Sequence, residues 1–120
     1  MEMCDEMKKL RSLLDAKGVK WTDLSEVMSE SRIEASMQCS NYEFDRNMFD
    51  LTFYRTHFEV NNRKYSVIYG YGTYGGYDPV FHKDNKLLEL WEIDHGDPHG
   101  WLTAEEVIKE CFGDVDETNN

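Results

Sequence analysis

Apolar side chains recur every three or four residues near the start of the chain, at Met3, Met7, Leu10 and Leu14. This spacing predicts an amphipathic helix over residues 3–17. Gly18 stands where glycine commonly ends a helix, because glycine readily adopts the left-handed backbone conformation needed there. A helix of this length is only marginally stable by itself, so we expect it to pack against a sheet.

Alternating apolar, aromatic and β-branched residues predict a β-hairpin within residues 48–69. Asn61 and Asn62 form the expected turn, since asparagine tolerates the positive φ angles of a two-residue hairpin turn. The alternation changes phase between Phe53 and Phe58. We interpret this change as a β-bulge near residues 55–57.

Residues 22–47 contain few apolar side chains and many serines, asparagines and acidic residues. The first part of this range predicts a short helix that would carry Leu24, Val27 and Met28. The remainder has the composition of a loop. We therefore expect 22–47 to be an insertion or a mobile excursion from the fold.

Three further segments complete the chain. The apolar run 85–93 fits either a strand or one to two helical turns, and residues 94–100 predict a turn-rich loop. Thr103 and Glu106 have the spacing of a helix-capping box, so a second helix is expected from there. The helix should end at Gly113, followed by a frayed acidic tail over 114–120.

The order of these elements predicts an α+β fold. We expect one domain over residues 1–120, in which a small antiparallel sheet built around the central hairpin carries the N-terminal and C-terminal helices on one face. A chain of 120 residues is the usual size of one domain and can bury a single core without disulfides.

The net charge of the chain limits the classes of partner that it can bind. It has 24 acidic and 13 basic residues and a net charge of −11. We therefore expect no direct binding to nucleic acid, whose phosphates need cationic contacts, and none to anionic membranes. The sequence shows no membrane-spanning run and no signal peptide, and its three cysteines are far apart. We expect a cytoplasmic protein with neither a cofactor nor a bound metal.

A glycine- and tyrosine-rich segment follows the hairpin. This Gly-Tyr loop, residues 70–79, has four tyrosines in or next to it: Tyr69, Tyr71, Tyr74 and Tyr77. Its G-x-G-x-x-G spacing lacks the helix that a dinucleotide-binding turn requires. Two interpretations remain open, either a loop whose tyrosines pack against the domain or a binding surface where tyrosines stack on a ligand.

Basic and histidine residues give two further candidate sites. Arg55 and His57 lie near the hairpin with Arg63 and Lys64, and an arginine there can bind phosphate. The segment 94–99 contains two histidines and two aspartates. With His57 it would be the site of a small metal-dependent hydrolase, whereas the simpler interpretation is a polar turn.

The acidic residues Glu105, Glu106 and Glu110 crowd the predicted C-terminal helix. They either keep the protein soluble or form a surface that imitates a nucleic-acid backbone. Such a surface would be attracted to a protein with a basic groove, and its binding would weaken with salt.

Several stretches resemble small phage and prophage proteins of Gram-positive gut bacteria: residues 4–18, 54–61, 65–76, 87–90 and 100–108. The resemblance implies a phage origin and, by analogy with other small phage proteins, a role in counter-defence inside the host cell cytoplasm. It implies no particular catalytic residue.

We expect a non-enzymatic counter-defence protein that acts by tight binding to a host immune protein or to a nucleotide signal. In the leading hypothesis the acidic face inhibits a nucleic-acid-binding immune complex, such as a CRISPR effector. In the alternative, Arg55, His57 and the Gly-Tyr loop sequester a nucleotide immune signal across a homo-oligomer interface. The metal-dependent hydrolase is the second alternative.

Overall fold

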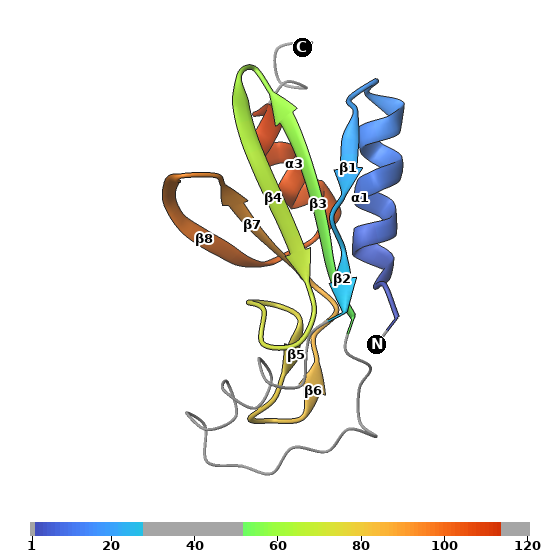
Figure 1. The fold of residues 1–120 in the computed structure, drawn as a ribbon, viewed down its shortest axis with the longest axis vertical. Helices are drawn as coiled ribbons and strands as arrows, with labels where there is room; N and C mark the ends of the chain where they lie inside the picture. Colours follow the sequence, from blue (N-terminus) through green and yellow to red (C-terminus); the bar gives the residue numbers. More distant parts are fainter. Residues whose placement is uncertain (1, 28–51, 114–120) are drawn as a thin grey trace.

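The computed structural model describes residues 2–27 and 52–113. The main sheet is antiparallel, with the order β1-β3-β4-β7-β8, and β2 pairs with β3 beside β1. These strands are β1 (Trp21–Asp23), β2 (Glu26–Val27), β3 (Thr52–Val60), β4 (Arg63–Tyr69), β7 (Leu88–Glu92) and β8 (His95–Leu102). The strands β5 (Tyr77–Asp78) and β6 (Lys83–Asp84) form a small separate sheet below it (Figure 1).

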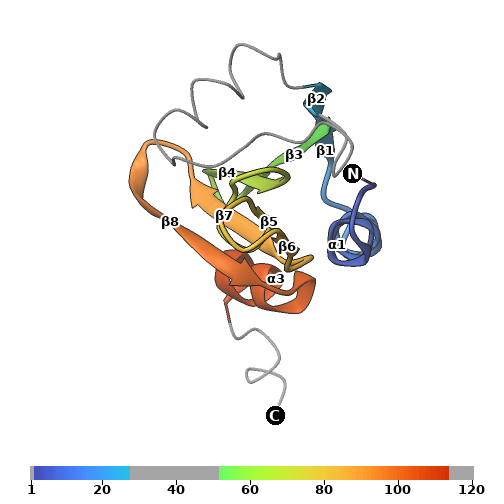
Figure 2. The same cartoon turned by 90° about the horizontal axis from the view of Figure 1, so that it is seen from below.

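Two helices, α1 (Asp5–Ala16) and α3 (Ala104–Phe112), lie on the same side of the main sheet (Figure 2). Each helix contributes one apolar stripe to the core. The buried side chains of the helices are Met7, Leu10, Leu14, Ala104, Val107 and Cys111. They pack against inward-facing sheet residues that include Phe58, Tyr65, Val67, Leu88 and Leu90. The predicted α+β fold, with both helices on one face of an antiparallel sheet, is confirmed.

The start of α3 and the ends of both helices lie where the sequence predicted them. The Thr103 side chain accepts a hydrogen bond from the Glu106 backbone, and the Glu106 side chain accepts one from the Thr103 backbone. This capping box satisfies amide groups that the first turn of a helix leaves unpaired. Gly113 follows α3 with φ 76°, and Gly18 follows α1 with φ 71°, so both helices end at a left-handed glycine.

The central hairpin has the predicted turn and lacks the predicted bulge. Asn61 and Asn62 have φ angles of 51° and 66°, and the strands pair without interruption from Tyr54–Tyr69 to Val60–Arg63. The change of phase has a different cause. Side chains alternate between the two faces of a strand, so Phe53 and Phe58 point to opposite faces of β3.

The prediction for residues 22–28 was wrong over the part that the structure describes. Instead of a short helix, this part forms β1 and β2, which both pair with β3, so the sheet extends through Val27. Asp23 holds the link between the two strands, because its Oδ1 accepts hydrogen bonds from the backbone N and the Oγ of Ser25 at 3.0 and 2.5 Å. The rest of the expected excursion, residues 28–47, and the expected tail, 114–120, lie outside the described residues.

The expected loop at 94–100 is mostly strand β8, and the ambiguous segment before it is strand β7. The turn between them is short and includes Asp94, which has φ 66°. β8 lies at the edge of the sheet and its pairing with β7 shifts register twice. An edge strand tolerates Pro98 and the neighbouring glycines, because its outer backbone groups need no partner strand.

Candidate functional site

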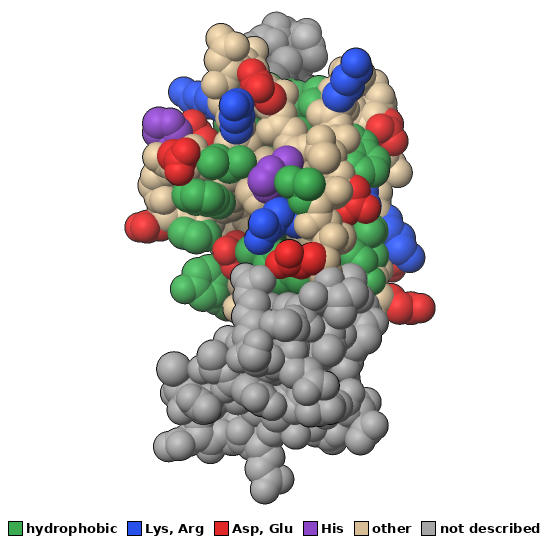
Figure 3. Space-filling view, in the orientation of Figure 1, with side chains coloured by type: hydrophobic (Ala, Val, Ile, Leu, Met, Phe, Trp, Pro, Cys, Tyr) green, Lys and Arg blue, Asp and Glu red, His purple; other side chains and the backbone are tan. Residues whose placement is uncertain are grey.

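The sheet face opposite the helices brings together side chains from three neighbouring strands. His57, Ser66 and Trp91 occupy facing positions on β3, β4 and β7. Arg55, Ile68 and Glu89 form the next row along the same strands. Figure 3 shows this face, where basic, histidine and apolar side chains lie next to one another.

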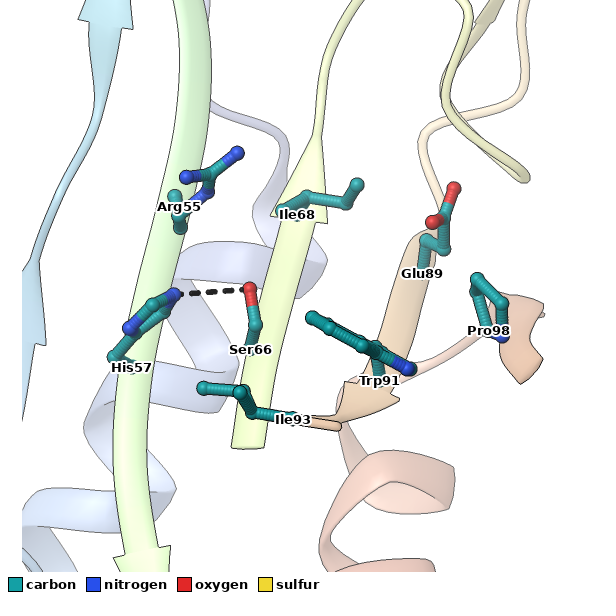
Figure 4. Close-up of a pocket in the computed structure, with 8 residues that line it drawn as sticks. All are labelled: Arg55, His57, Ser66, Ile68, Glu89, Trp91, Ile93 and Pro98. Atoms are coloured by element: carbon teal, nitrogen blue, oxygen red, sulfur yellow. Dashed lines mark hydrogen bonds between the residues drawn. The ribbon is translucent and has the colours of Figure 1, made fainter. Parts of the chain in front are cut away.

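These two rows line a hollow of about 220 Å³, which we call the sheet-face pocket. Its surface is mainly apolar, and it is lined by Ile68, Trp91, Ile93 and Pro98 together with the polar residues Arg55, His57, Ser66 and Glu89 (Figure 4). Apolar walls with a few convergent polar groups are typical of small-molecule sites. The volume is below the roughly 300–1,000 Å³ of sites that enclose a whole ligand. The pocket therefore fits one part of a larger ligand.

Arg55 provides the permanent positive charge of the pocket. Its Nε is buried, and no described residue accepts a hydrogen bond from it. Its guanidinium lies over the Phe53 ring, 5.2 Å from the ring centre. The backbone of Arg55 is held by Ser25 and Leu24, at 3.1 and 2.9 Å. A buried donor without an acceptor is costly, so this group is well suited to an anionic ligand.

His57 contributes a hydrogen-bonding group beside this charge. Its Nε2 is 3.1 Å from Ser66 Oγ (Figure 4). Burial and the positive charge of Arg55 both lower the pKa of His57 below its ordinary value of 6.5. His57 is therefore neutral at pH 7 in the absence of an anion. An anion in the pocket would favour its protonated form.

Glu89 connects the sheet-face pocket to the Gly-Tyr loop. Its side chain lines the pocket, and its Oε1 accepts a hydrogen bond from the Tyr74 backbone N at 2.7 Å. Burial raises the pKa of this carboxyl group, and the hydrogen bond partly offsets the rise. The loop that carries Tyr74 is thus bonded to a residue that lines the pocket.

Three of the four tyrosines expected to bind a ligand are instead packed inside the protein. Tyr69, Tyr71 and Tyr77 are buried. The Tyr69 hydroxyl donates to Asp84 Oδ2 at 2.5 Å, and burial with this contact raises the pKa of Tyr69. The rings of Tyr71 and Tyr77 stack with their centres 6.0 Å apart. Only Tyr74 among the four is exposed, so the packing interpretation holds for most of the loop.

The acidic residues singled out on α3 are each engaged within the protein. Glu105 forms an ion pair with Lys9, and Glu106 caps the helix. Glu110 Oε1 lies 2.7 Å from His99 Nδ1. The described residues carry 16 acidic and 11 basic side chains, so more than half of the net charge of −11 comes from the rest of the chain.

The histidines expected to bind a metal do not converge. Among residues 2–27 and 52–113, no group of three or more His, Cys, Asp or Glu side chains is arranged to hold a metal ion. His57 lies on β3, whereas His95 and His99 lie on the edge strand β8 and are exposed. An extended strand separates residues that a compact loop would have brought together.

Sequence reasoning missed four side chains that complete this region: Ser66, Glu89, Trp91 and Trp101. Because side chains alternate along a strand, the apolar pattern of β4 and β7 already places Ser66 and Trp91 on the face away from the core. Their placement beside His57 requires the strand order and register, which no single segment contains.

Comparisons of this chain with protein-family models, with curated proteins and with solved structures found no match. Within the described ranges, no helix has both the length and the apolar character to cross a membrane. The resemblance to phage proteins stays a prediction. The chemistry of the sheet-face pocket is therefore the basis on which a function can be proposed.

Proposed function

We propose that the protein is a non-enzymatic binding protein that captures an anionic group of a small ligand in the sheet-face pocket. The observation that supports this proposal is the buried Nε of Arg55, which lacks a hydrogen-bond acceptor among the described residues. A phosphate supplies such an acceptor together with a full opposite charge. A nucleotide signal is the ligand that best combines this charge with the aromatic surface nearby.

Binding without turnover fits the pocket better than catalysis does. His57 and Ser66 have the contact of a base with a nucleophile, at 3.1 Å. However, Ser66 lies within β4 and pairs with strands on both sides. The neighbouring backbone amides are therefore used in the sheet ladder and are not directed at a reacting carbonyl oxygen. The pair is suited to holding a ligand by hydrogen bonds.

In this proposal the protein sequesters a nucleotide immune signal and so acts in phage counter-defence. The phage setting comes from the sequence resemblance, and the capture comes from Arg55 and the pocket around it. This function corresponds to the alternative hypothesis, in which Arg55, His57 and the Gly-Tyr loop together sequester a nucleotide signal.

An acidic inhibitor of a nucleic-acid-binding immune complex, such as a CRISPR effector, is the second candidate. The net charge of −11 favours it. Eight acidic and two basic residues lie outside the described ranges, so the acidic surface would have to include that part of the chain. Affinity for the complex should then fall steeply as salt rises. A salt-independent affinity would exclude this candidate.

The test of the proposed function is a thermal-shift and calorimetric screen with cyclic dinucleotides, cyclic trinucleotides and ADP-ribose derivatives. A ligand at 100 times its Kd stabilises a protein by about 2.7 kcal/mol, which gives a clear rise in Tm. Arg55→Met should remove the rise. Arg63→Met is the matched control, because it deletes the same charge from an exposed position on β4. Equal responses of the two variants, or no response of the wild type, would contradict the proposal.

A further inference from the structure

Two large aromatic side chains remain at the surface beside the sheet-face pocket. Tyr74 is 52% exposed and Trp101 is 58% exposed. Their rings stack on each other with centres 5.7 Å apart and planes inclined by 19°. We call this pair the aromatic platform.

Backbone hydrogen bonds hold the two residues of the platform next to each other. The Trp101 N donates to the Tyr74 O at 3.0 Å, and the Leu87 N donates to the Gly75 O at 2.8 Å. A Cβ at Gly100 would lie 2.2 Å from the Tyr74 Cβ. The Gly-Tyr loop and β8 therefore approach each other more closely than any residue with a side chain would allow at this position.

Trp101 also has a strained backbone. Its φ is 56°, in the left-handed region that bulky residues rarely adopt. The next residue, Leu102, is buried, whereas the Trp101 side chain remains largely exposed. The pairing of β7 with β8 shifts register between Leu88 and Leu90, so Trp101 lies in a β-bulge that accounts for its φ angle. Bulges at sheet edges commonly re-aim a side chain, and this one leaves the Trp101 ring at the surface.

The platform and the pocket meet at Glu89. This side chain lines the pocket and binds the Tyr74 backbone at 2.7 Å. The pocket, at about 220 Å³, holds only part of a ligand. A larger ligand that extends from the pocket past Glu89 would therefore reach the Gly-Tyr loop at Tyr74.

We propose that the platform of Tyr74 and Trp101 is a second subsite that stacks the base of a nucleotide whose phosphate lies at Arg55. This inference rests on the proposed function and adds to it the two side chains that bind the base. Stacking on aromatic side chains accepts any base, since every base has a π-face. The platform thus supplies affinity, and Arg55 supplies the preference for phosphate.

The test compares inorganic phosphate, ribose 5-phosphate and the four ribonucleoside 5′-monophosphates by titration calorimetry with the full chain. At least one monophosphate should bind about tenfold or more tightly than ribose 5-phosphate, which is the usual scale of one base–aromatic stack. Trp101→Ala should remove this margin and leave the affinity for ribose 5-phosphate unchanged. Trp101→Phe should retain most of the margin because it keeps a ring.

Phe81→Ala is the matched control, since Phe81 is also exposed but lies outside the platform, and it should leave every affinity unchanged. Monophosphates that bind no more tightly than ribose 5-phosphate would overturn the platform and leave the phosphate site intact. The platform would also be overturned if Trp101→Ala kept the margin. Phosphate compounds that do not bind, or that bind equally to Arg55→Met, would overturn the proposed function itself.

Discussion

Replacing Arg55 by methionine should make the free protein more stable while abolishing capture of the anion. Methionine retains most of the length of the arginine stem, so the contacts of the stem with the sheet-face pocket are largely preserved. The backbone bonds of Arg55 to Ser25 and Leu24 do not involve its side chain and remain. The substitution removes the charge and the buried Nε donor.

The expected magnitude follows from two opposing effects. A buried donor without an acceptor costs about 1–3 kcal/mol, and the variant no longer has this cost. The contact of the guanidinium with the Phe53 ring, at 5.2 Å, contributes about 0.5–1 kcal/mol and is lost. The net result is a stabilisation of about 1 kcal/mol. For a domain of this size that raises Tm by roughly 4 °C.

Urea and thermal denaturation of Arg55→Met and Arg63→Met measure this difference directly. Arg63→Met removes the same charge from the surface and should change the free energy of unfolding by less than about 0.5 kcal/mol. The reasoning would be refuted if Arg55→Met were less stable than the wild type by more than about 1 kcal/mol. That result would mean that the guanidinium is already satisfied in the free protein and needs no ligand.

Three further outcomes are expected. Thr103→Ala should destabilise the protein by about 1 kcal/mol in urea denaturation, because it removes half of the capping box, while Thr103→Ser should be nearly neutral. Folding lowers the pKa of His57, so the unfolded chain binds protons more readily and the wild type loses stability as pH falls below about 6.5. His57→Gln should show a smaller loss between pH 7 and about 5, and an identical pH profile would contradict the assignment. In Gly76→Ala the new Cβ would lie 2.1 Å from Thr73 Oγ1 and 2.3 Å from the Gly70 O, so we expect a loss of more than about 2 kcal/mol by thermal denaturation.

Elements defined by local interactions could be predicted from the sequence. The capping box at Thr103 and the left-handed glycine at Gly113 involve residues close in the chain, and both are confirmed. The turn at Asn61 and Asn62 is also confirmed, since it requires only residues that tolerate positive φ. Strand β8 could not be predicted, because its glycines and Pro98 are acceptable only at the edge of a sheet, and edge position depends on the whole topology.

The candidate site was predictable only in part, for a related reason. Residue type and proximity singled out Arg55 and His57, and the structure places both in one pocket, on a strand that pairs without the predicted bulge. Residue type alone also selected the tyrosines, most of which are buried. Trp91 and Trp101 join the site through strand pairing and loop contacts, which depend on residues far apart in the chain.

The contact between the two helices has a consequence for synthesis of the protein. Glu6 Oε1 accepts a hydrogen bond from the Ala104 backbone N at 2.7 Å, across a separation of 98 residues. Lys9 and Glu105 form an ion pair beside it. At roughly 5–20 residues per second of translation, Ala104 is synthesised on the order of 5–20 s after Glu6. The partners of α1 on β3 are made earlier, since Thr56 already bonds Met7 and Arg11. The apolar stripe of α1 can therefore pack on the sheet first, and the bonds between the two helices form in a later step.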